Sequence, residues 1–231
     1  MDLNEKVVLI TGAKGGLGSF VTPAFLEAGA RVIGLSRSIA DSDFPNERFS
    51  AVAAEISDGA IASKIVGSVV GKSGRVDVLV HLVGGFAGGK PVAETDDDVI
   101  DRMIDMNFRS AFHLIRAVLP SMREQGGGRI LAIGSKAAVE PAPMAGAYAA
   151  SKAALVSLIR TVARENADSG ITANVVLPGT MDTPANRAAA PTADFSKWVN
   201  PCQVASLLVH IASGRAAHIN GAVIPIYGRE A

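Results

Sequence analysis

The sequence predicts an α/β fold built on a parallel sheet. Short apolar runs alternate with helix-like segments from end to end, and the composition does not change abruptly anywhere along the chain. This alternation is typical of strand–helix–strand units, whose strands run parallel. The chain has 231 residues with no linker, repeat or low-complexity segment, so we expect a single domain over residues 1–231.

Seven apolar runs are the expected strands, at residues 7–10, 31–35, 49–53, 76–80, 129–133, 171–177 and 222–226. Helices are expected between them, at residues 16–29, 58–72, 95–124, 147–166 and 201–213. Gly12 follows the first strand and Gly84 the fourth. Thr95 or Asp96 can cap the third helix, and Pro201 suits the first turn of the last one.

Residues 183–200 follow neither pattern. They are rich in Ala, Pro, Thr and Asp, and they are too many for a plain connector. Loops of this length in α/β enzymes are often lids, so we expect a substrate loop here. A disordered insertion is the alternative.

The composition excludes several classes of protein. Basic and acidic side chains number 22 each and the pI is about 6.9, which argues against non-specific binding to nucleic acid or to an anionic membrane. No apolar run approaches the roughly 18 residues of a membrane span, and the first residues lack the pattern of a signal peptide. With one Cys and no metal-spaced pair of His, we expect a cytoplasmic protein without a disulfide or a metal site.

The first strand runs into a glycine-rich turn. Gly12, Gly16 and Gly18 follow a G-x-x-x-G-x-G spacing in the first strand–helix connection. Such a turn lets the backbone approach a pyrophosphate and aims a helix N-terminus at its charge. Any connection of this type can use Gly, so the turn by itself indicates a dinucleotide site only in combination with other motifs.

Tyr148 and Lys152 lie one helical turn apart, on the same face of an expected helix. Tyr has an unperturbed pKa near 10, and lowering it by about three units needs roughly 4 kcal/mol of preferential stabilisation of the phenolate. A nearby ammonium group supplies part of that energy. Taken alone, such a pair is usually an ordinary helix surface.

Two further residues strengthen this interpretation. Ser135 lies at the carboxyl end of the fifth strand, which is the edge where open α/β sheets bind ligands. Asn107 lies in the middle of the preceding helix, where an amide is an indifferent helix former. An Asn bonded to the backbone is the structural alternative.

Together these motifs resemble the short-chain dehydrogenase/reductase family. The residues that carry the resemblance are Gly12, Gly16, Gly18, Asn107, Ser135, Tyr148, Lys152, Asn174, Pro178 and Gly179, in the family's order and spacing. The resemblance implies a Rossmann fold with a seven-stranded, mostly parallel sheet and helices on both faces. It also implies a nicotinamide cofactor and hydride transfer at a carbonyl or alcohol carbon.

The resemblance also implies roles for single residues. Tyr148 is the expected general acid for carbonyl reduction and the base for the reverse reaction. Lys152 is expected to bind the nicotinamide ribose and to lower the pKa of Tyr148, and Ser135 to hydrogen-bond the substrate oxygen. Asn107 is expected to hold a water that links Lys152 to solvent.

The expected cofactor-binding residues come from six segments. They are Gly12, Lys14, Gly15, Gly16, Leu17, Gly18, Ser36, Arg37, Glu55, Ile56, Gly84, Tyr148, Lys152, Pro178, Gly179, Thr180 and Thr183. Ser36 and Arg37 end the second strand without the acid that binds the 2′-OH of NAD, and they suit a 2′-phosphate. We therefore expect NADP rather than NAD, with a solvated Arg37 as the alternative.

The chain departs from the family's pattern in three places. His81-Leu82-Val83-Gly84 stands where the family usually has Asn-Asn-Ala-Gly, and for His81 we favour a structural role. Glu55 replaces the common Asp near the adenine. The last strand ends in Ile226-Tyr227-Gly228 instead of Asp-Gly-Gly.

The expected function is an NADP(H)-dependent oxidoreductase for a small carbonyl or secondary alcohol. Two alternatives from other classes are a non-catalytic NADP-binding sensor of the same fold and an interaction protein that uses the apolar helix 108–122. The resemblance implies that this helix serves self-association, as the family's helix interfaces do, and we expect a homotetramer or a dimer.

Overall fold

The computed structural model describes residues 3–229, and its centre is a seven-stranded sheet. The strand order is β3-β2-β1-β4-β5-β6-β7, and all the pairings between neighbours are parallel. The strands are β1 (Val7–Thr11), β2 (Arg31–Ser36), β3 (Phe49–Ala53), β4 (Val78–His81), β5 (Gly128–Ile133), β6 (Ile171–Pro178) and β7 (Val223–Ile226). The predicted α/β class and Rossmann-type sheet are therefore confirmed.

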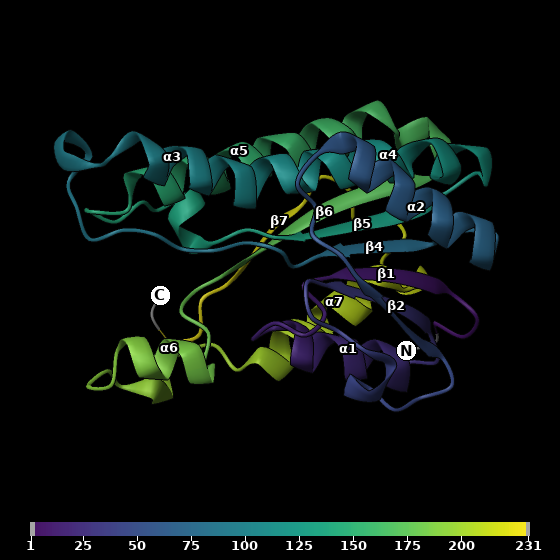
Figure 1. Cartoon of the computed structure of the whole chain (residues 1–231), viewed down its shortest axis with the longest axis horizontal. Helices are drawn as coiled ribbons and strands as arrows, with labels where there is room; N and C mark the ends of the chain where they lie inside the picture. Colours follow the sequence, from purple (N-terminus) through teal and green to yellow (C-terminus); the bar gives the residue numbers. More distant parts are fainter. Residues whose placement is uncertain (1–2, 230–231) are drawn as a thin grey trace.

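Helices cover both faces of this sheet (Figure 1). The helices are α1 (Gly18–Glu27), α2 (Gly59–Ser73), α3 (Asp97–Ile104), α4 (Ser110–Glu124), α5 (Gly146–Glu165), α6 (Pro184–Ala189) and α7 (Pro201–Ala212). Within a strand, Val7 and Leu9 pack toward α2, α4 and α5, whereas Val8 and Ile10 pack toward α1 and α7. Strands buried on both faces account for the apolar composition. No helix within residues 3–229 has the length and apolar character needed to cross a membrane.

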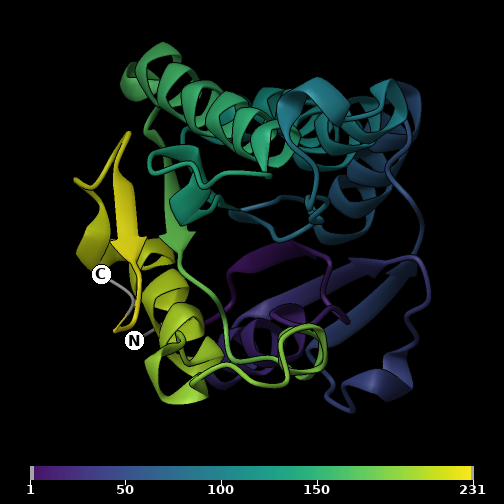
Figure 2. The ribbon, with the colours of Figure 1, turned by 90° about the vertical axis from the view of Figure 1, so that its left-hand side faces the viewer.

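The strand order reverses direction between β1 and β4. From β1 the chain builds outward to β2 and β3 on one side, and from β4 it builds outward to β7 on the other. Ligands of open α/β sheets bind outside the carboxyl ends of the strands at such a reversal. Figure 2 shows α5 on one side of the molecule and the segment that carries α6 on the opposite side.

The third expected helix, over residues 95–124, is not continuous. A π-helical turn at Asp105–Arg109 separates α3 from α4. Single π turns inside α-helices occur frequently at functional sites, and this one carries Asn107.

Residues 183–200 are also more regular than their composition suggests. Thr183 caps α6 by accepting a hydrogen bond from the amide of Asn186 at 3.3 Å. Arg187 pairs with Asp182, with Nε 2.5 Å from Oδ1, and its guanidinium lies 4.7 Å from the ring centroid of Phe195. Local capping and these contacts order a segment that has no apolar periodicity.

Candidate active site

In the glycine-rich turn after β1, the backbone of residues 12–18 folds tightly back on itself. Gly12 has φ +69°, and the amide of Gly15 donates to its carbonyl at 2.8 Å. A side chain at Gly18 would place Cβ 2.1 Å from the carbonyl oxygen of Gly12, so only glycine fits there. No side chain caps the N-terminus of α1, which begins at Gly18. The turn and the helix end therefore suit a pyrophosphate group.

The segment after β6 lies against this turn. Gly179 follows the end of β6, and its amide donates to the carbonyl of Ile226 at 3.0 Å. Thr183 is buried, and its Cγ2 lies 3.7 Å from the point where a side chain at Gly16 would begin. Pro178, Gly179, Thr180 and Thr183 thus belong to a segment that reaches the predicted phosphate turn.

Charged and polar groups gather at the end of β2. The backbone amide of Lys14 donates to Ser36 Oγ at 3.1 Å, and Lys14 Nζ pairs with Asp43 at 2.7 Å. Arg37 Nη1 lies 3.9 Å from Glu55 Oε1, and both side chains are mostly exposed. An exposed pair of this kind contributes little stability, so Arg37 is available to a stronger anionic partner.

Ile56, next to Glu55, packs against the core beneath α2 and α4. Its side chain therefore belongs to the hydrophobic layer in this structure. Glu55 and Ile56 remain predictions as cofactor contacts.

Ser135 and Tyr148 meet at the carboxyl end of β5. The Ser135 side chain lies close to the Tyr148 hydroxyl, and Ser135 Oγ accepts the amide of Ala137 at 3.2 Å. Burial raises the pKa of Tyr148 above its usual value, and the nearby Ser135 hydroxyl opposes this only in part. The lowered pKa expected from Lys152 is therefore not produced by the protein groups in this structure.

Lys152 is buried one turn after Tyr148. Its Nζ donates to the carbonyl of Ile133, the last residue of β5, at 3.0 Å. Burial lowers the pKa of this ammonium group to about 8. This hydrogen bond ties the amine to the end of β5 and limits its freedom to move.

The side chain of Asn107 ties the π turn to the loop after β4. Its Oδ1 accepts the amide of Gly85 at 2.9 Å, and its Nδ2 donates to the carbonyl of Gly85 and to Ser151 Oγ, both at 3.0 Å. Ser151 in turn donates to the carbonyl of Tyr148 at 2.7 Å. Asn107 therefore connects α5 to this loop.

The loop after β4 packs closely on the site at Gly84. A Cβ on this residue would be 2.8 Å from Asn107 Oδ1 and 2.9 Å from Lys152 Nζ, which is too close for a carbon atom. Only glycine therefore lets the loop approach Asn107 and Lys152 this closely. Oδ1 and Nδ2 of Asn107 are both bonded to protein groups, so the water expected beside Asn107 remains a prediction.

The sequence predictions and the structure can be compared residue by residue. The structure brings Asn107, Ser135, Tyr148, Lys152 and Gly84 together. It holds Lys14 and Arg37 beside acids at the other end of the glycine turn. Sequence reasoning missed Ser151, which bonds to both Asn107 and the Tyr148 carbonyl. Its position between Tyr148 and Lys152 in the sequence is the one signal that points to it.

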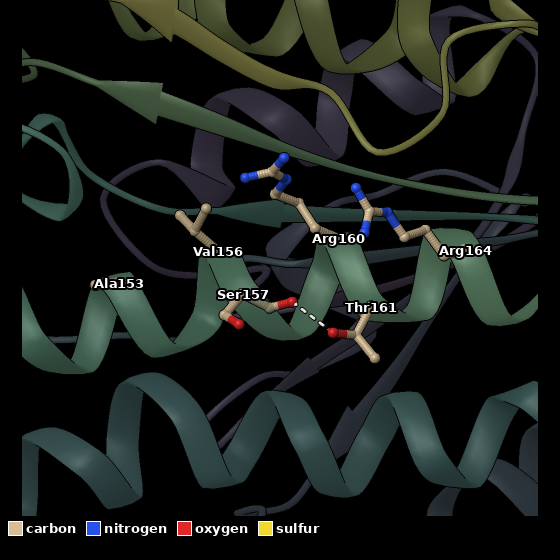
Figure 3. Close-up of a pocket in the computed structure, with 6 residues that line it drawn as sticks. All are labelled: Ala153, Val156, Ser157, Arg160, Thr161 and Arg164. Carbon is tan, nitrogen blue, oxygen red and sulfur yellow. Dashed lines mark hydrogen bonds between the residues drawn. The ribbon is translucent and has the colours of Figure 1, made fainter.

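A surface groove runs along the outer side of α5, beyond Lys152 (Figure 3). It is lined by Ala153, Val156, Ser157, Arg160, Thr161 and Arg164. The Thr161 hydroxyl is bonded to the Ser157 carbonyl at 3.0 Å. None of the expected site residues lines this groove.

Comparison with known proteins agrees with this site. A model of the short chain dehydrogenase family matches residues 6–194. The 2-dehydro-3-deoxy-D-gluconate 5-dehydrogenase of Pseudoalteromonas atlantica is 31% identical over 98% of this chain and 96% of its own. The chain belongs to the short-chain dehydrogenase/reductase family, whose named relatives here are dehydrogenases and reductases acting on CH–OH or C=O groups.

Solved structures share the whole fold. The 3-ketoacyl-(acyl-carrier-protein) reductase from Brucella melitensis, complexed with NADH, superposes with a TM-score of 0.89 at 27% identity over 100% of both chains. ElxO with NADP bound superposes with a TM-score of 0.91 at 27% identity, over 97% of this chain and 98% of its own. This protein is accordingly an oxidoreductase of that family.

Proposed function

We propose that the protein is an NADP(H)-dependent oxidoreductase that interconverts a small carbonyl compound and a secondary alcohol. The observation that carries this proposal is the cluster of Ser135, Tyr148 and Lys152 at the carboxyl end of β5, next to the reversal of the strand order. A nicotinamide cofactor, when bound, supplies or accepts the hydride.

Each side chain of the cluster has a proposed task. Ser135 donates a hydrogen bond to the substrate oxygen. Tyr148 gives its phenolic proton to that oxygen during reduction and takes it back during oxidation. Lys152 returns protons to Tyr148, and a water held near Asn107 relays protons between Lys152 and solvent.

The binding residues proposed for the cofactor are the glycine turn with Leu17, the segment 178–183, Lys152 and Gly84. Two local features support the fit: the tight turn that only Gly18 allows and the contact between Thr183 and Gly16. Ser36, Arg37 and Lys14 favour NADP over NAD because they offer a hydroxyl and two cations to a 2′-phosphate.

The proposal extends to assembly and location. Phe112 on α4 is half-exposed beneath Arg116, whose guanidinium lies 5.5 Å from the ring centroid. Such apolar surface on an outer helix supports a homodimer or a homotetramer. An exposed free thiol at Cys202 supports a reducing compartment, the cytoplasm.

The test is turnover by the Tyr148→Phe variant. Oxidation of NADPH is followed by its absorbance while ketones, aldehydes and acyl thioesters are screened. The variant is expected to lose about a hundredfold or more in kcat and to keep its affinity for NADPH. Full turnover by the variant would show that Tyr148 is not the general acid. A wild-type protein that binds NADPH but turns over none of the compounds would favour the non-catalytic NADP-binding sensor.

A further inference from the structure

Apolar side chains are unusually exposed on two loops. Among residues 3–229, four large hydrophobic side chains are at least half-exposed: Val92 at 77%, Phe86 at 69%, Met144 at 54% and Val139 at 50%. All four follow β4 or β5, at the edge of the sheet that carries Tyr148. Apolar surface gathered in one place marks a binding site more often than scattered apolar residues do.

Three of these residues lie on the two loops beside Tyr148, and we call them the apolar lip: Phe86, Val92 and Met144. The ring of Phe86 meets that of Tyr148 edge to face, with centroids 5.0 Å apart. Val92 Cγ2 lies 2.8 Å from the Cβ position of Gly146, two residues before Tyr148. The carbonyl of Met144 accepts the amide of Gly89 at 2.8 Å, which joins the two loops.

The backbone conformation of Met144 is energetically unfavourable. Its φ is +64°, a value that non-glycine residues rarely adopt, and within residues 3–229 Glu5 is the one other non-glycine residue with positive φ. Strained backbone persists where the surrounding structure imposes it, and it is concentrated at functional sites. At Met144 the result is an exposed thioether side chain, and both its carbonyl oxygen and the Phe86 ring lie 2.8 Å from the Cβ position of Gly88.

The same loops carry two cations, Lys90 and Lys136, and three acids, Glu94, Asp96 and Glu140. Lys90 Nζ lies 2.6 Å from Asp96 Oδ2, and Lys136 Nζ lies 3.4 Å from Glu140 Oε2. Neither loop contains an Arg. A phosphate or carboxylate on a substrate would have to compete with these acids for a cation, so the loops are built for a neutral molecule.

We propose that the apolar lip binds the body of an uncharged ketone that carries an aromatic or alicyclic ring, while Ser135 and Tyr148 hold its carbonyl oxygen. This rests on the function proposed above. In the reduction, the carbonyl carbon takes a hydride from the reduced nicotinamide cofactor and the oxygen takes a proton from Tyr148. The products are a secondary alcohol and the oxidised cofactor.

The test compares three carbonyl compounds on the full chain with NADPH: acetoacetate, ethyl acetoacetate and ethyl benzoylacetate. The first two share a skeleton and differ in charge, and the third replaces a methyl with a ring. The expected order of kcat/KM is ethyl benzoylacetate first and acetoacetate last, with about tenfold or more between the two esters.

The Phe86→Ala variant decides whether the lip causes this order. It is expected to lower kcat/KM for ethyl benzoylacetate by about tenfold and for ethyl acetoacetate by less than about twofold. The control is Ile61→Ala, which removes an apolar, partly exposed side chain from α2 and should change neither value of kcat/KM.

Binding without turnover separates this inference from the proposed function. Calorimetry with ethyl benzoylacetate and NADP⁺, a pair that cannot react, is expected to show binding that Phe86→Ala weakens. Binding of this kind without turnover of any of the three compounds would contradict the proposed function and would still support the apolar lip as a binding site. The apolar lip is wrong if acetoacetate is the preferred substrate, or if Phe86→Ala lowers turnover equally for all three compounds. Either result would leave the proposed function supported. If the protein shows no binding and no turnover of these compounds, both the apolar lip and the proposed function are wrong.

Discussion

His81 at the end of β4 and Thr11 at the end of β1 are joined by a buried hydrogen bond, with Nδ1 3.0 Å from Oγ1. The amide of Leu82 also donates to Thr11 Oγ1, at 3.3 Å. On the other side of the ring, His81 Nε2 lies 3.3 Å from Ser110 Oγ. Because the single proton of the Ser110 hydroxyl goes to the carbonyl of Met106, the neutral ring carries its proton on Nε2 and Nδ1 accepts from Thr11.

The chain of hydrogen bonds continues into the π turn. The Ser110 hydroxyl donates to the carbonyl of Met106 at 2.7 Å, next to Asn107. His81 therefore links the start of the glycine turn to the element that positions Asn107. The structural role predicted for His81 agrees with these contacts, and the family's usual amide is replaced by a ring with one donor and one acceptor.

The first prediction concerns stability against pH. Burial, with a smaller contribution from the Lys152 charge, lowers the pKa of His81 to about 3. Below the unfolded-state pKa near 6.5 the unfolded chain takes up a proton that the native state does not, so native stability falls as the pH falls. At pH 5 the expected loss from His81 is about 2 kcal/mol, measured by urea unfolding at pH 7 and pH 5.

The control is His81→Gln, whose amide does not titrate. It should be less stable than the wild type at pH 7 and should lack the part of the pH dependence that His81 causes. The other histidines are present in both proteins, so their contributions cancel. Equal pH slopes in the two proteins would show that His81 takes up a proton as readily in the native state as in the unfolded one.

The second prediction concerns a methyl group added at Gly84, which lies against Lys152 and Asn107. Gly84→Ala puts Cβ 2.8 Å from Asn107 Oδ1 and 2.9 Å from Lys152 Nζ, which are too close for a carbon atom. One of the two groups must move, and kcat is expected to fall by about tenfold to a hundredfold. Steady-state kinetics with saturating NADPH measure the effect.

Gly67→Ala is the matched control for this change. Gly67 lies inside α2 with open space around its Cβ position, so alanine should raise the free energy of unfolding by about 0.5–1 kcal/mol and leave kcat unchanged. If kcat of Gly84→Ala stays within about twofold of the wild type, the exact placement of Asn107 and Lys152 does not matter for the reaction.

The third prediction concerns the choice of cofactor. Arg37→Ala should raise the Kd of NADPH by about tenfold, because charge-assisted hydrogen bonds to a phosphate are lost, and should leave the Kd of NADH nearly unchanged. Glu55→Gln should lower the Kd of NADPH, because it removes the carboxylate that lies 3.9 Å from Arg37. Fluorescence titrations measure both constants, and a wild-type protein that binds NADH more tightly would refute the preference for NADP.

The fourth prediction concerns the strained residue of the apolar lip. Met144→Gly relieves the positive φ and should raise the free energy of unfolding by up to about 1 kcal/mol, offset in part by the greater entropy of an unfolded glycine. Met144→Ala keeps the strain and should not stabilise. Thermal unfolding of both variants provides the comparison, and a Met144→Gly variant no more stable than Met144→Ala would show that the backbone there is not strained.

Several features of the site follow from local sequence patterns. The sequence by itself determined the order of strands and helices, because apolar periodicity and glycine at turns are local properties. It also singled out Tyr148, Lys152, Ser135 and Asn107, whose spacing matches one family. The sequence did not predict the interruption of the long helix at Asn107. Residues 95–124 have a continuous helical pattern, and a π turn differs from an α-helical turn by only one residue.

Tertiary structure alone decided how these residues are held. The partner of His81 lies 70 positions away on another strand, and the Lys152 amine is bonded to the end of β5. The apolar lip likewise depends on two loops that pack around Tyr148. Contacts between residues distant in the chain arise only when the sheet assembles, since burial and hydrogen bonding are properties of the packed chain and not of any segment.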